Sequence, residues 1–166
     1  MANPDGWMMT EKEPTSRRKA REMAMCCAFE IEVGGQDPEE AIERTIEEQE
    51  ITGPSREFIR NWVRLVSEKR EAIDELIREL AVGWTLERMA KVDLAILRLA
   101  IAELLIGLEE PAPADAVIIN EAIVLAKKFS TPDSGRFVNG ILANVVKGKE
   151  NYSARVRGDE NRPEDE

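Results

Sequence analysis

The sequence predicts an all-α protein, a compact orthogonal bundle of about seven helices arranged in two helical subdomains. Apolar residues recur at positions i, i+3, i+4 and i+7 along most of the chain, which places them on one face of a helix. Strand-type alternation of apolar and polar residues is nearly absent. Hydrophobic residues make up 43% of the 166 residues and aromatic residues only 5%, a balance typical of helical proteins with aliphatic cores.

A short arm precedes the first expected helix. Residues 1–15 hold two prolines and a glycine among polar side chains, so we expect this segment to be flexible. A helix then begins at Ser16 and ends at the Gly34-Gly35 pair. Its apolar residues follow helical spacing, which predicts one buried face.

Two longer segments follow. Asp37 and Pro38 begin the second helix, because an aspartate can cap the first free N–H groups and a proline suits the first helical turn. Ser55 caps a long apolar-periodic stretch that Gly83 closes. This stretch forms one helix, or two helices divided near residues 68–70.

The most apolar segment is expected at the centre of the bundle. Residues 92–106 have so few polar positions that a helix there must be covered on nearly every side. Arg98 lies within it and stays protonated, so it must reach water or pair with a carboxylate. Glu103 and Glu121 are the candidate partners.

The remaining helices are separated by prolines. Pro111 and Pro113 predict a loop, and Asp115 can cap the helix that follows and continues to Phe129. A Thr-Pro-Asp break comes next, and Ser134 starts the last expected helix. The predicted organisation is therefore a flexible arm at 1–15, a helical domain at 16–148 and a disordered acidic tail at 149–166.

Composition excludes several classes of function. A formal net charge of -10 argues against a protein that coats nucleic acid or an anionic membrane over its whole surface. No segment has the length and apolarity of a membrane span, so we expect a cytoplasmic protein. Histidine is absent and the two cysteines, Cys26 and Cys27, are adjacent, so we expect no enzyme activity, metal site or cofactor.

The start of the first helix carries the sharpest local anomaly. Residues 16–21 read Ser-Arg-Arg-Lys-Ala-Arg, four cations without an acid in an otherwise acidic chain. Cations in a first helical turn oppose the helix dipole, which costs roughly 0.3 to 1 kcal/mol each. A bound phosphate backbone would offset that penalty. The alternative is a solvated basic turn that forms salt bridges with surface acids.

A second candidate site lies at the start of the last helix. Free backbone N–H groups there suit an anion, Arg136 adds positive charge, and Phe137 offers a ring for base stacking if it is exposed. The alternative for Phe137 is a core anchor. Glu87 and Asp93, near the start of the central helix, are either solvated acids or part of a negative face for a basic partner.

Four segments together resemble the NusB family. They are residues 17–22, 96–104, 120–129 and 134–140, and the resemblance spans about residues 16 to 147. It implies an all-α fold and a partner, NusE, which is also a ribosomal protein of the small subunit. It further implies that the pair binds boxA-type single-stranded RNA and acts with RNA polymerase in an antitermination complex that reads through terminators in ribosomal RNA operons.

The resemblance also implies site residues. Those implied for RNA binding are Arg17, Arg18, Lys19, Arg21, Asp133, Arg136 and Phe137. Those implied for NusE binding are Phe29, Glu87 and Asp93. Phe29 stands where the family often has a tyrosine, so a partner contact there lacks a hydroxyl group.

Three alternatives stay open at this point. The chain resembles the N-terminal domain of certain ribosomal RNA cytosine methyltransferases, although it lacks the length for their catalytic domain. It is otherwise a helical protein-interaction module without RNA contact. A homodimer that hides the basic face is a further alternative for the free protein.

Overall fold

The computed structural model describes residues 13–109 and 111–158, and within these ranges every regular element is helical. The all-α prediction is confirmed. The seven α-helices and one short 3₁₀-helix in the described residues are α1 (Arg17–Gly34), α2 (Pro38–Glu48), α3 (Ser55–Leu80), η1 (Leu86–Arg88), α4 (Lys91–Leu105), α5 (Asp115–Phe129), α6 (Pro132–Lys147) and α7 (Lys149–Arg157). None of these helices is long and apolar enough to cross a membrane.

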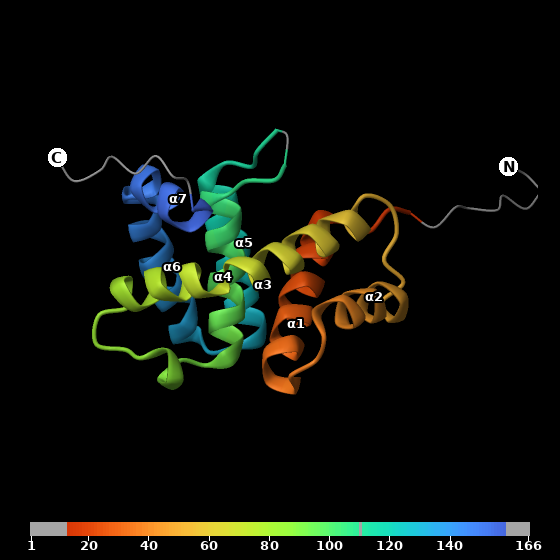
Figure 1. Ribbon diagram of the computed structural model, residues 1–166, viewed down its shortest axis with the longest axis horizontal. Coiled ribbons are helices and arrows are strands. Elements are labelled where there is room, and N and C mark those ends of the chain that lie inside the picture. The colour runs from red at the N-terminus through yellow and green to blue at the C-terminus, as the bar shows by residue number, and fades with distance from the viewer. Residues whose placement is uncertain (1–12, 110, 159–166) are drawn as a thin grey trace, which may run out of the picture.

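The helices form two groups that share α3. The helices α1 and α2 pack against α3 on one side, and α4 to α7 surround its other part (Figure 1). The helix α4 contacts α1, α3, α5, α6 and α7, and all of its residues from Asp93 to Leu105 are buried. The prediction that this helix lies at the centre is confirmed.

Side-chain caps set several helix starts. Ser16 Oγ accepts a hydrogen bond from the Lys19 backbone N–H, and an Asp37 carboxylate oxygen does the same for Glu40. The helix α6 begins two residues earlier than expected, at Pro132, because the Thr131 hydroxyl caps it instead. Similarly, Ser55 does not cap α3: it is the first helical residue, and its hydroxyl donates to the Thr15 carbonyl at 2.7 Å.

The long third helix is undivided. Of the two alternatives, the single helix is confirmed, and its polar residues 68–70 face other helices and solvent. Lys69 Nζ donates to the Arg157 carbonyl at 3.0 Å, and Arg70 pairs with Glu32 at 3.2 Å. The polar residues at 68–70 therefore mark contacts of α3 with other helices, and the helix continues through them.

The predicted domain boundaries need two corrections. Residues 149–157 form α7 instead of a disordered tail, because Val156 is buried and the Arg157 guanidinium donates to the Leu105 and Ile106 carbonyls at the end of α4. The arm is also shorter than expected, since Thr15 and Thr52 are joined by backbone and side-chain hydrogen bonds. The remaining arm residues 1–12 and tail residues 159–166 lie outside the described residues.

The predicted partners of Arg98 were wrong. Arg98 binds both oxygens of Asp74, at 2.7 and 2.9 Å, and also pairs with Glu32. Glu103 lies five positions further along α4, about 140° around the helix, and therefore faces a different neighbour. Arg98 thus joins α4 to α1 and α3.

Candidate nucleic-acid interface

Three cations at the start of α1 lie on the surface. The side chains of Arg17, Arg18 and Lys19 are 42%, 65% and 46% exposed. Each one contacts a carboxylate: Arg17 Nε lies 3.2 Å from Glu109 and Lys19 Nζ lies 3.4 Å from Glu22. These cations are paired within the chain but remain accessible to a ligand.

Arg18 makes the most defined of these contacts. Its Nε and Nη2 donate to the two oxygens of Glu121 on α5, at 3.1 and 2.9 Å. The hydrogen bonds from Arg18 hold the pKa of the Glu121 carboxyl below its ordinary value. Arg18 therefore ties the start of α1 to the middle of α5.

Arg21, by contrast, lies in the interior. Its side chain is only 7% exposed and its Nε donates to Glu103 on α4 at 2.9 Å. Burial raises the pKa of Glu103 to about 7, and the positive charge of Arg21 opposes that shift. The sequence-based assignment had placed Arg21 on the RNA side, but in this structure its side chain is buried and holds α1 against α4.

The end of α5 adds two cations that the assignment had not included. Lys128 Nζ pairs with Glu22 on α1, and its side chain is 59% exposed. Lys127 lines an open hollow of about 530 Å³ together with Arg136 of α6. The Lys127-Lys128 pair near the end of α5 was the available sequence signal. We call the six exposed cations of α1, α5 and α6 the cationic strip; they are Arg17, Arg18, Lys19, Lys127, Lys128 and Arg136.

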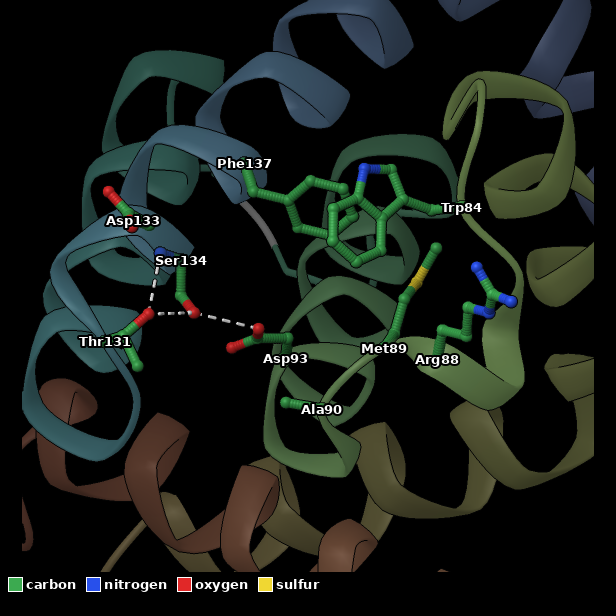
Figure 2. Close-up of a pocket in the computed structure, with 9 residues that line it drawn as sticks. All are labelled: Trp84, Arg88, Met89, Ala90, Asp93, Thr131, Asp133, Ser134 and Phe137. Atoms are coloured by element: carbon green, nitrogen blue, oxygen red, sulfur yellow. Dashed lines mark hydrogen bonds between the residues drawn. The ribbon is translucent and has the colours of Figure 1, made fainter.

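A second hollow lies beside the start of α6. It has a volume of about 290 Å³, and its lining is shown in Figure 2. The rings of Trp84 and Phe137 lie 6.0 Å apart at 59° and form one of its walls. Phe137 is half-buried and Trp84 is exposed, so this pair presents aromatic surface to a ligand. We call this site the aromatic hollow.

Asp93 lies within the same hollow. Its Oδ2 accepts a hydrogen bond from Ser134 Oγ at 2.9 Å (Figure 2). Its Oδ1 is buried and has no hydrogen-bond partner among the described residues. A buried carboxylate oxygen without a partner is unfavourable, so this atom is ready to accept a donor from a bound molecule.

The structure therefore regroups the site residues expected from the sequence. Asp133 and Phe137, which the sequence assigned to RNA, line one hollow with Asp93, which it assigned to a protein partner. Glu87 is exposed on η1, while Phe29 is half-buried on α1 and lines neither hollow. Trp84 was not among the expected site residues, although a tryptophan directly after Gly83, where a predicted helix ends, was a usable sequence signal.

Comparison with known proteins agrees with the resemblance seen in the sequence. The model of the NusB family matches residues 18–147. The chain is 43% identical over 141 residues to the transcription antitermination protein NusB of Symbiobacterium thermophilum, which covers 80% of this chain and 90% of that relative.

Solved structures give the same result. NusB of T. maritima matches with a TM-score of 0.74 and 34% identity, over 81% of this chain and 93% of that one. A crystal structure of the antitermination factors NusB and NusE in complex with dsRNA contains a chain that matches with a TM-score of 0.70 and 26% identity, over 80% of this chain and 96% of that one. The protein described here therefore belongs to the NusB family of transcription antitermination proteins.

Proposed function

We propose that this protein binds boxA-type single-stranded RNA of ribosomal RNA operons together with NusE and acts in the antitermination complex of RNA polymerase. The observation that carries this proposal is the cationic strip, which gathers six exposed cations from three helices on a chain of net charge -10. Its action is binding and positioning, without a chemical step.

The cationic strip supplies the electrostatic part of RNA binding. Arginine and lysine side chains neutralise phosphates, and such contacts fix the position of a strand without reading its sequence. The strip extends from Arg17 on α1 across Lys128 to Arg136 on α6, so a single strand can follow it. The acidic remainder of the surface repels RNA, which confines the strand to this path.

The aromatic hollow supplies contacts to bases. Single-stranded RNA exposes unstacked bases, and proteins bind them by stacking on aromatic rings. Trp84 and Phe137 offer such a surface next to Arg136 of the strip, and Asp133 lines the same hollow. We assign Asp133, Arg136 and Phe137 to the RNA side for this reason.

The proposed partner surface is acidic. NusE is a ribosomal protein, so we expect its contact surface to be basic and to complement the exposed Glu87 and the negative charge of Asp93 close beneath the surface of the aromatic hollow. Phe29 would contribute apolar contact on α1. Because Asp93 lies in the aromatic hollow, the RNA and protein sites adjoin each other, which favours joint binding.

A mobility-shift experiment with boxA-type RNA tests the proposal. We expect the R17A/R18A/K19A variant to lose on the order of 10- to 100-fold in affinity, because three phosphate contacts are removed. The control is R44A/R60A/R64A, which removes three arginines that pair with carboxylates outside the strip. The control should bind RNA within about twofold of the unmodified protein. Equal losses in both variants would contradict the assignment.

Adding NusE tests the partner side. The unmodified protein should bind boxA RNA more tightly when NusE is present. The E87Q variant should lose most of this gain while its RNA affinity without NusE is unchanged, because Glu87 lines neither hollow. An unchanged gain would show that NusE binds elsewhere.

A further inference from the structure

Two carboxylates lie beneath the cationic strip. Glu22 and Glu121 are only 10% and 13% exposed at their side chains, whereas the cations that they contact are about half exposed or more. Glu121 binds Arg18 through two hydrogen bonds, and Glu22 contacts both Lys19 and Lys128. Half of the six strip cations are thus held by two sheltered acids.

Both carboxylates are negatively charged at neutral pH. Hydrogen bonds from Arg18 lower the pKa of Glu121. Burial opposes ionisation of Glu22, but the hydrogen bonds from Lys128 and Lys19 bring its pKa below the ordinary value. The charge of each acid therefore acts on any phosphate that approaches Arg18, Lys19 or Lys128.

A phosphate at these cations meets two obstacles. It must replace or share the hydrogen bonds that Arg18 already gives to Glu121. It also comes within a few ångströms of a carboxylate that is too sheltered to be screened fully by salt. Both effects lower the affinity of the strip for a polyanion of any sequence.

We infer that Glu22 and Glu121 are built-in competitors of phosphate, which keep the cationic strip from holding single-stranded RNA or other polyanions by charge alone. Stable binding then needs the additional contacts of the aromatic hollow. This inference rests on the proposed function for its RNA ligand, but the competition itself applies to every phosphate chain.

The test measures binding of the E22Q/E121Q variant to inorganic polyphosphate, to poly(U) and to boxA-type RNA. Glutamine keeps the shape and the hydrogen-bonding carbonyl oxygen but removes the charge. At about 50 mM salt we expect the affinity for polyphosphate and poly(U) to rise about tenfold, and the gain should shrink as salt increases.

The matched control is E39Q/E43Q. Glu39 and Glu43 also pair with arginines through two hydrogen bonds each, but these pairs lie between α2 and α3, away from the strip. Both variants change the net charge by the same amount. The control should alter polyphosphate affinity by less than about twofold, because its charges are distant and screened.

Three outcomes would overturn the inference: no gain in E22Q/E121Q, weaker binding that shows the acids only orient the cations, or an equal gain in the control. Thermal unfolding followed by circular dichroism verifies that both variants are folded. If boxA RNA fails to bind the unmodified protein while polyphosphate binding still rises in E22Q/E121Q, the proposed function fails and this inference stands.

Discussion

Three ion pairs, made by two buried residues of α4, fix the central helix from different faces. Arg98 joins α4 to Asp74 of α3 and Glu32 of α1, and Glu103 joins α4 to Arg21 of α1. Breaking such a pair by removing one partner costs about 3–5 kcal/mol, because the other charge stays buried. These residues hold α1 against α4 and so position the exposed cations one turn before Arg21.

Glu103 makes the stability of the protein sensitive to pH. Its pKa is raised from an ordinary value of 4.5 to about 7 by burial and by Glu109, while Arg21 and Arg17 oppose the shift. When the pH lies between these two pKa values, Glu103 keeps its proton in the folded protein but has lost it in the unfolded chain. The stabilising contribution of this proton is therefore complete below about pH 4.5 and is lost as the pH rises through about 7.

Comparison with E103Q isolates this contribution. The glutamine does not titrate, so we expect the free energy of unfolding of the unmodified protein, relative to E103Q, to fall by about 3 kcal/mol between about pH 4.5 and pH 8. Urea unfolding at several pH values measures it. A relative stability that rises over this interval would show that pairing with Arg21 outweighs burial.

At the residue scale, the sequence indicated which residues carry charge but not which of them are buried. Arg18 and Arg21 differ by three positions and belong to the same cluster, yet one is exposed and the other is interior. Only the position of α4 decides this, because Glu103 approaches α1 at Arg21. The pairing of Arg98 with Asp74 and Glu32 likewise depends on long-range packing.

At the scale of helices, local signals predicted most of the bundle. The structure confirms the helices that apolar spacing predicted. It also confirms the caps predicted for α1 and α2, which are Ser16 and Asp37. The helix α7 was missed because Val156 is its one buried residue, so it lacks a visible apolar face. Its stability comes from contacts with α3, α4 and α6, which the local sequence does not reveal.

Truncation tests the role of α7. Deleting residues 149–166 removes Val156 from the core and leaves the carbonyls at the end of α4 without Arg157, so we expect a loss of about 2–5 kcal/mol in the free energy of unfolding. Deleting only residues 159–166 should change it by less than about 0.5 kcal/mol. Urea unfolding compares the two. Equal effects, or no effect from the longer deletion, would contradict the correction of the domain boundary.

At the scale of the whole molecule, charge is distributed unevenly. Six exposed cations gather on the strip, whereas Arg60 and Arg64 of α3 are half-buried and pair with Glu43 and Glu39 of α2. The family, the fold and the α1 part of the strip could be predicted from the sequence. The sequence could not predict that the strip continues across α5, or that Asp93 and Phe137 line the same hollow. Both features depend on how α4, α5 and α6 pack.

The salt dependence of boxA RNA binding tests the central claim most directly. If four to six phosphates are contacted on a single strand, the logarithm of affinity should fall with the logarithm of salt concentration at a slope of roughly -3 to -4. In the R17A/R18A/K19A variant the slope should become shallower by about 2, since each lost phosphate contact removes about 0.7. A flat response of the unmodified protein, or an unchanged slope in the variant, would contradict RNA binding on the cationic strip.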